Sequence, residues 1–390
     1  MKVTLLVLAL VSLVFIQTES KVSTTDPPMA ASDISVIDEI ITKSMAISKV
    51  RGVTIGITGP KGSMTKSYGV AGKKKLTPDA YYRMGSITKS FTALAVLREV
   101  EKGNLSLDDK LSQFVSGVPN GNLITIKHLL MMRSGVYDYQ ANSKVKVLFY
   151  LNPTNPWTPA NALQIIKTSK PMFAPGKSYY YTNSNYILLG YVLKAITGRD
   201  PIEIITTDII APLNLTKTGY PKGTRLPAPS AVGYGPNWLG QYTDRTAFNP
   251  NLFWTAGALY TTVADMLRWG AAMRDGELLR PETVAALRDP ANFVESPYSG
   301  RQPPPVGIKQ GPETFGYGMG IIQVGSWFGH TGSVPGFSTV VMFEPSSGAV
   351  ITVMEEFQTP GIQAMARIWY LVAKHLYPDS TDVKGYQWQN

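Results

Sequence analysis

Cysteine is absent from the 390-residue sequence, and histidine is scarce. Without cysteine the chain has no disulfide, no thiolate metal site, no catalytic thiol and no lipid-modified N-terminal cysteine. The three histidines, His128, His330 and His375, lie far apart and form no His-x-x-x-His pair. A zinc hydrolase is therefore not expected, and the sequence predicts neither a metal ion nor another cofactor.

Long apolar runs are missing except near the start, where one extends from Leu5 to Ile16. A lysine precedes this run and small residues follow it at Thr18 and Ser20, which is typical of a secretory signal peptide over residues 1–20. The run is short for a spanning helix, which needs roughly 20 apolar residues; an uncleaved anchor is the alternative. We expect a mature chain without a membrane span, secreted to the extracellular space or the periplasm.

Acidic residues are fewer than basic ones: the sequence has 27 Asp and Glu and 37 Lys and Arg, which gives a net charge of +10. Basic clusters occur at Lys73–Lys75 and around Lys144 and Lys146. The simple interpretation is a solvated cationic surface, and the alternative is attraction to anionic surfaces or wall polymers. No nucleic-acid-binding motif is present, so nucleic acid is not an expected partner. We expect a monomer.

The order of patterns along the chain predicts an α+β protein in which both chain ends build one sheet. No internal repeat of about 20–50 residues is present, which excludes solenoids and propellers. A linker (21–33) precedes the sheet domain (34–104 and 301–378), which encloses a mostly helical domain (105–300) and is followed by a tail (379–390). Helical spacing is found at 34–49, 125–132, 160–168, 185–197, 263–273 and 362–377. Strand patterns are found at 52–58, 63–70, 326–332, 337–343 and 349–355.

The chemically most informative pattern is Ser-x-x-Lys, which occurs at Ser63, Ser86 and Ser143. The context favours Ser86, because it alone is expected where a helix begins. There, Lys89 lies on the same helical face as Ser86, and the helix N-terminus offers N–H groups to a carbonyl oxygen. Ser63 falls in a predicted hairpin and Ser143 in a predicted basic loop. A plain helix N-cap is the alternative for Ser86.

Two further segments support Ser86. Tyr181-Thr182-Asn183 follows 95 residues later (181 − 86), and His330-Thr331-Gly332-Ser333 stands on a predicted strand 149 residues after that (330 − 181). Similar tripeptides occur at 150–152 and 217–219. The second of these is rejected because no strand pattern precedes it.

With these three motifs in order, residues 34–376 resemble the serine β-lactamase and penicillin-recognising enzyme family. The resemblance is strongest to the branch of class C β-lactamases, Streptomyces-type D-Ala-D-Ala carboxypeptidases and D-aminopeptidases. It extends to the segments 124–139 and 329–338. It implies a β-lactamase/transpeptidase-like fold: an antiparallel sheet flanked by helices, a mostly helical inserted domain, and the site between them.

The resemblance also implies a role for each motif residue. Ser86 would attack a carbonyl and form an acyl-enzyme, Lys89 and Tyr181 would share the acid–base work, and Asn183 would hold the substrate amide and Lys89. His330 would occupy a strand position usually filled by lysine. The backbone N–H groups of Ser86 and Ser333 would form the oxyanion hole. Substrate contacts are expected from Thr331, Gly332 and Ser333, and Trp254, Trp238 and Tyr242 are candidates to line or cover the cleft.

Two departures from the family pattern bear on the substrate. An unperturbed imidazole titrates near pH ~6–7, so we expect His330 to contribute a limb there to the pH profile. The strand segment Gly318–Val324 contains no arginine that would grip a free C-terminal carboxylate. This casts doubt on strict carboxypeptidase specificity.

The leading hypothesis is a secreted serine hydrolase that acts on D-amino-acid peptides or related amides. Among enzymes, the alternatives are a β-lactamase of class C type and a carboxylesterase. The alternative that is not an enzyme is a non-catalytic binding protein of the same fold. A Ser-His-Asp hydrolase would need a Gly-x-Ser-x-Gly elbow, which is not found. Asn104 and Asn214 are glycosylation acceptors if the host glycosylates.

Overall fold

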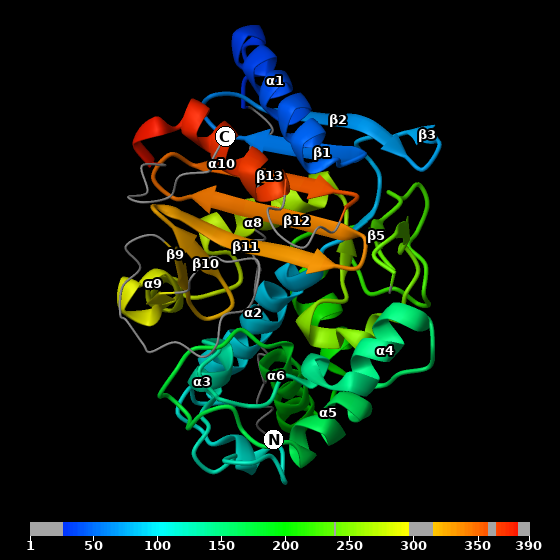
Figure 1. The fold of residues 1–390 in the computed structure, drawn as a ribbon. Coiled ribbons are helices and arrows are strands. Elements are labelled where there is room, and N and C mark those ends of the chain that lie inside the picture. The colour runs from blue at the N-terminus through cyan, green and yellow to red at the C-terminus, as the bar shows by residue number, and fades with distance from the viewer. Residues whose placement is uncertain (1–25, 238, 296–314, 358–363, 381–390) are drawn as a thin grey trace, which may run out of the picture.

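The computed structural model describes residues 26–237, 239–295, 315–357 and 364–380, and an antiparallel sheet runs through the upper half of the molecule in Figure 1. The strand order is β3-β2-β1-β13-β12-β11-β10-β9-β8. The strands from the two ends of the chain meet where Ile55 of β1 pairs with Val353 of β13. This confirms the predicted sheet built from both ends. Its strands are β1 (Gly52–Thr58), β2 (Met64–Ala71), β3 (Lys74–Lys75), β8 (Val294–Glu295), β9 (Phe315–Tyr317), β10 (Ile322–Val324), β11 (Trp327–Val334), β12 (Phe337–Glu344) and β13 (Ala349–Glu355).

Helices cover both faces of this sheet. α1 (Ala31–Ser48) and α10 (Ala364–Leu376) pack together on one face, and α8 (Val263–Asp275) packs on the other against β1, β12 and β13 (Figure 1). Close approach of α8 requires Gly270, because a Cβ there would lie 2.4 Å from a methyl carbon of Val350. Because helices cover both faces, every residue of β12 and β13 is buried. α8 thus packs on the sheet although its residues fall within the predicted helical domain (105–300).

Most of the remaining helices gather below the sheet in Figure 1, around a buried central helix, α6. α6 begins at Asn183, since the Thr182 hydroxyl accepts a hydrogen bond from Ser184 N, and it ends at Gly198 in the left-handed conformation that favours glycine. Residues Ser184–Gly190 are fully buried because α2, α3 and α5 surround them. The helices of this region are α2 (Thr88–Glu101), α3 (Ile126–Leu130), α4 (Ser143–Leu151), α5 (Pro159–Thr168), α6 (Asn183–Thr197) and α7 (Pro201–Ile204). α9 (Pro281–Arg288) lies apart from them, at the left of Figure 1 beside β9 and β10, and its Arg288 donates to Met273 O and Arg274 O of α8.

The segment containing Ser143 is a helix and not the predicted loop. The side chain of Asn142 caps α4 by accepting a hydrogen bond from Lys144 N at 3.0 Å. Val145 is buried and Phe149 packs against Phe253, with ring centroids 5.2 Å apart. Tertiary contacts on one face therefore hold a helix whose other face is basic and apolar.

Two short two-stranded sheets connect the large sheet to the helical region. β4 (Tyr82–Arg83) pairs with β7 (Tyr260–Thr261), and β5 (Tyr234–Pro236) pairs with β6 (Tyr242–Asp244). Within the described residues, no helix has the length and apolar character needed to cross a membrane. The predicted signal peptide and the predicted tail from residue 381 lie outside the described residues.

Candidate active site

Ser86 lies in a tight 3-10 turn, Gly85–Ile87, between β4 and α2. The sequence predicted a helix start here, and the structure inserts this single turn before α2 begins at Thr88. Met84 fixes the entry to the turn, because its N–H donates to Leu259 O at 3.0 Å and its carbonyl accepts from Thr339 Oγ1 at 2.9 Å. The turn is thus anchored to β12 of the sheet through Thr339 and to the segment before β7 through Leu259.

β11 passes directly over this turn. Gly85 adopts a φ of +56°, and a Cβ there would lie 2.7 Å from Ser333 N. The turn with Ser86 and the strand with Ser333 therefore lie side by side, and these residues carry the two N–H groups predicted to form the oxyanion hole. Along β11, Thr331 and Ser333 are partly exposed, whereas His330 and Gly332 are buried. The alternation leaves Thr331 and Ser333 as the motif side chains open to a ligand.

Lys89 lies one helical turn from Ser86 and is completely buried. Its Nζ lies 2.9 Å from Ser86 Oγ, 2.6 Å from Asn183 Oδ1 and 2.7 Å from Ala256 O. Burial lowers the pKa of Lys89 well below its ordinary value of 10.5, and the nearby Asp138 opposes this only in part. The structure therefore favours a neutral amine at this position.

The hydrogen-bond partners of Lys89 fit a neutral amine. Asn183 Oδ1 and Ala256 O are acceptors, and a neutral amine has two N–H groups to donate to them. In the charged form Lys89 Nζ donates to Ser86 Oγ, and in the neutral form its single lone pair is left for this remaining partner. A lone pair facing a serine hydroxyl is the arrangement that a general base requires.

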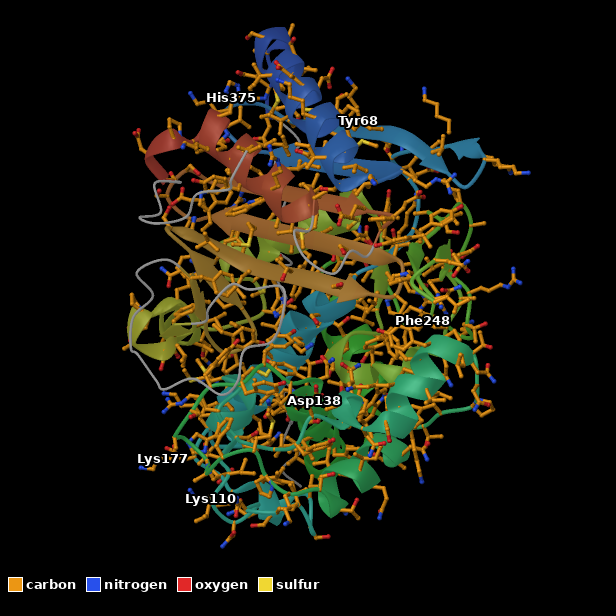
Figure 2. All side chains as sticks on the ribbon, viewed as in Figure 1. Tyr68, Lys110, Asp138, Lys177, Phe248 and His375 are labelled. Atoms are coloured by element: carbon orange, nitrogen blue, oxygen red, sulfur yellow. The ribbon has the colours of Figure 1, made fainter. Side chains whose placement is uncertain are left out.

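Asn183 is itself fixed by a residue that the sequence analysis missed. Its Nδ2 donates to Gln140 Oε1 at 2.6 Å, which orients its oxygen toward Lys89. Asp138 (labelled in Figure 2) accepts hydrogen bonds from Gln140 N at 3.2 Å and from Thr182 Oγ1 at 3.0 Å. Gln140 directly follows the segment 124–139 that carries part of the family resemblance. That adjacency was the only sequence signal for its role.

Tyr181 packs over the lysine, with its ring centroid 4.9 Å from Lys89 Nζ. Burial raises the pKa of Tyr181 well above 10, although a hydrogen bond with Ser86 opposes this shift. The phenol is therefore protonated at neutral pH. A protonated phenol can act as a proton donor, and a neutral lysine amine can act as a base.

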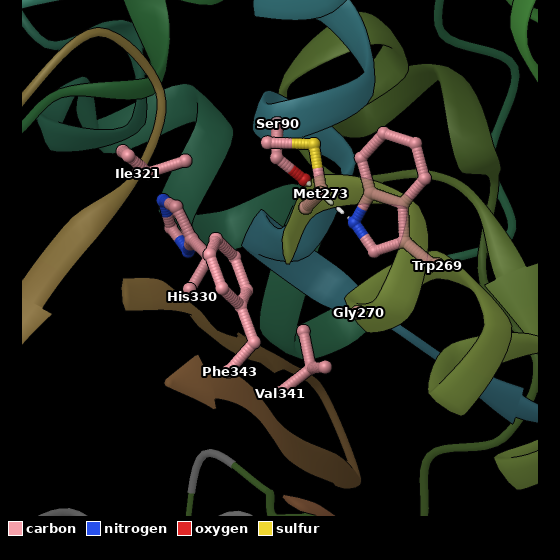
Figure 3. Close-up of a pocket in the computed structure, with 9 residues that line it drawn as sticks. Ser90, Trp269, Gly270, Met273, Ile321, His330, Val341 and Phe343 are labelled. Carbon is pink, nitrogen blue, oxygen red and sulfur yellow. Dashed lines mark hydrogen bonds between the residues drawn. The ribbon is translucent and has the colours of Figure 1, made fainter. Parts of the chain in front are cut away.

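His330 is buried, and its expected titration near neutrality is wrong. Burial, with a smaller contribution from Lys89, lowers its pKa to about 3. Its Nδ1–H donates to Thr331 O, and its ring lies between those of Tyr181 and Tyr317, with centroids 6.4 and 5.8 Å away. Figure 3 shows the ring facing Ile321 and Phe343 across a small cavity. The imidazole is thus neutral over the whole working range.

The described aromatic side chains among the candidates to line the cleft, Trp254 and Tyr242, each pack on another aromatic ring. Trp254 is only 6% exposed and packs on Tyr191, with ring centroids 5.2 Å apart. Gly190 makes room for it, because a Cβ there would lie 2.8 Å from the indole. Its ring is therefore held in the interior, and its contact with substrate stays a prediction. Tyr242 is exposed and stacks on Phe357, and Trp238 lies outside the described residues.

The other two histidines have structural contacts. His128 completes a capping box with Thr125 at the start of α3, and His375 Nε2 lies 3.0 Å from Asp33 Oδ1. Among the described residues, no group of three or more His, Asp or Glu side chains is placed to hold a metal ion.

Comparison with known proteins identifies the family. A family model described as Beta-lactamase matches residues 37–374. The chain belongs to the beta-lactamase family. It is therefore a serine hydrolase of the β-lactamase type.

Individual relatives of this beta-lactamase-family chain are distant. PbpX of Bacillus subtilis (strain 168) is 26% identical over 300 residues, which cover 75% of this chain and 67% of PbpX. Protein flp of Staphylococcus aureus is 30% identical over 244 residues, 60% of this chain, so the match spans about half (47%) of that relative's length. The solved D-amino acid amidase of Ochrobactrum anthropi SV3, in complex with D-phenylalanine, shares the fold: TM-score 0.77, 21% identity, 90% of this chain and 100% of that one.

Proposed function

We propose that this chain hydrolyses D-amino-acid amides or related peptides through an acyl-enzyme on Ser86. The observation that carries this proposal is the fully buried Lys89 amine, hydrogen-bonded to Ser86 Oγ at 2.9 Å. A serine hydroxyl becomes a competent nucleophile when a neighbouring base removes its proton. A base of this kind is present beside Ser86 alone among the three Ser-x-x-Lys serines.

In the proposed acylation step, Ser86 Oγ bonds to the substrate carbonyl carbon and its proton passes to Lys89 Nζ. The N–H groups of Ser86 and Ser333 would stabilise the resulting oxyanion, each by about 3–4 kcal/mol. When the carbon–nitrogen bond breaks, Tyr181 would protonate the departing amine and recover a proton from Lys89. Water would then attack the ester in the reverse sequence, with Lys89 again as the base.

The charges around the site favour a neutral leaving group over a free C-terminal carboxylate. His330 is neutral because of its depressed pKa, and β10 offers no arginine. The fold shared with a D-amino acid amidase is consistent with this choice. A binding protein without turnover is disfavoured, because Lys89, Ser86 and Asn183 keep their mutual hydrogen bonds.

The test compares four compounds: a D-phenylalanine amide, a D-Ala-D-Ala peptide, a penicillin and a p-nitrophenyl ester. Turnover is followed for each, together with the intact mass of the protein. We expect fastest turnover of the amide and a mass increase with penicillin, both abolished in Ser86→Ala. Ser143→Ala is the matched control and should behave as wild type. Amide turnover by Ser86→Ala would show that Ser86 is not the nucleophile. Rapid loss of penicillin without labelling of the protein would favour a β-lactamase.

We also propose that the protein is secreted as a monomer. The support for secretion is the signal-peptide pattern of residues 1–20. N-terminal sequencing of protein recovered outside the cytoplasm tests it, and a start at Met1 would contradict it. Light scattering measures the oligomeric state.

A further inference from the structure

Three segments that are distant in sequence form one side of the molecule, the right-hand edge in Figure 1. They are the β3 tip (72–75), the described residues of the β5–β6 hairpin (232–237 and 239–246) and α4 with its cap (142–152). Arg51 joins the first two, donating to Gly72 O at 3.1 Å and lying 4.3 Å over the Tyr234 ring. Arg245 joins the last two, donating to Tyr150 O at 3.1 Å and to Pro236 O at 3.3 Å. We call these segments the basic–apolar face.

Large apolar side chains are exposed on this face. On α4, Val147 and Leu151 are 57% and 61% exposed and lie on one side of the helix at i and i+4. Tyr150, Leu239 and Tyr242 are also among the exposed large hydrophobic residues. Few positions elsewhere in the described chain expose a residue of this kind. A cluster of exposed apolar side chains marks a binding site for another protein, a membrane or a ligand.

The charge of the same face is almost entirely positive. Its three segments contain one acidic residue, Asp244. Their lysines are all exposed: Lys73, Lys74 and Lys75 at the β3 tip and Lys144 and Lys146 on α4. Lys144 lies one helical turn before Val147, so cations and apolar groups occupy one strip of α4.

We propose that the basic–apolar face binds the surface of an anionic lipid bilayer. Lysines near such a surface are attracted by its negative potential, and aliphatic and aromatic side chains enter the boundary between headgroups and acyl chains. A soluble acidic polymer would satisfy the lysines and leave Val147 and Leu151 in water. The combination of both groups in one strip therefore favours lipid. Gln140, which holds Asn183, lies just before α4, so bound lipid would adjoin the active-site side of the molecule.

The experiment measures co-sedimentation of the purified protein with vesicles of phosphatidylcholine alone or mixed in equal parts with phosphatidylglycerol. One variant combines Val147→Ser with Leu151→Ser, and another combines Lys144→Gln with Lys146→Gln. The matched controls are Leu123→Ser, at a residue that is 55% exposed, and Lys110→Gln with Lys177→Gln. Lys110 and Lys177 are exposed and lie at the lower left in Figure 2, across the helical region from α4. None of these residues belongs to the catalytic machinery, so amide turnover should be unchanged in every variant.

We expect binding only to the vesicles that contain phosphatidylglycerol. The lysine variant should bind more weakly, by about fivefold for each charge removed, and the serine variant by about tenfold or more. Both controls should bind as wild type. Equal binding to neutral vesicles would overturn the proposal, as would equal weakening by the control lysines. Wild-type binding of the serine variant, with full competition by soluble poly-glutamate, would assign the face to acidic polymers instead.

Discussion

The same Ser-x-x-Lys spacing occurs at the turn that leads into α2 and at the start of α4, in very different surroundings. At α2, Lys89 is fully buried, and Ser86, Asn183 and Ala256 surround its amine. At α4, Ser143 and Lys146 are both exposed. A water-exposed ammonium keeps its proton at neutral pH, whereas burial disfavours the charged form and frees the lone pair. The difference in chemistry thus comes from burial and partners and not from the spacing.

The largest effect is expected from replacing Lys89, with Lys146 as the comparison. Lys89→Met should lower kcat/KM for a D-amino-acid amide by about 10²–10⁴-fold, the usual contribution of a general base. Lys146→Met should leave it unchanged. In wild type, activity should decline as pH falls, because acid protonates Lys89, and the limb should lie well below 10.5 because burial depresses this pKa. Steady-state kinetics over pH measures both, and circular dichroism checks the fold. Equal losses in the two variants would contradict the comparison.

A smaller effect is expected from the residues that precede the two serines. Gly85→Ala would place a Cβ 2.7 Å from Ser333 N at a left-handed φ. It should therefore displace β11 from the nucleophile, with a loss of about tenfold or more in kcat/KM and of about 1–2 kcal/mol in stability. Asn142→Ala removes only the cap of α4 and should cost about 1 kcal/mol.

Chemical denaturation and kinetics on both variants separate these outcomes. Retention of full activity by Gly85→Ala would show that the contact between the turn and β11 does not position the site. A fall in activity for Asn142→Ala would show that α4 is coupled to the site, through Gln140.

Sequence reasoning succeeded where local patterns suffice and failed where contacts distant in sequence decide. Apolar periodicity located α6 and α10, and the ordered motifs named Ser86, Lys89 and Asn183, which the fold joins by hydrogen bonds. It missed α4, because only packing on Phe253 shows which side of that segment is buried. Trp254 looked available for a ligand, since its packing partner Tyr191 is 63 residues away (254 − 191).

The pKa of His330 on β11 also depends on contacts that are distant in sequence. The sequence places His330 beside the site, and the imidazole's ordinary pKa then predicts titration near neutrality. Its actual environment is an interior bounded by Tyr181, Tyr317 and Lys89. No pattern within β11 shows that these groups exclude water from the ring.

The smallest expected effect concerns that histidine. With a pKa of about 3 in the fold and about 6.5 unfolded, His330 binds a proton more readily in the unfolded chain. Folding stability should therefore fall as pH drops from about 6.5 toward 3, by at most about 1.4 kcal/mol per pH unit from this residue. His330→Gln removes this contribution, so its unfolding free energy should depend less steeply on pH, while the kcat/KM profile between pH 5 and 8 keeps its shape. Urea denaturation at several pH values measures the slopes. A limb near pH 6.5 that vanishes in His330→Gln would show that the imidazole titrates in the active enzyme and is less buried than Lys89.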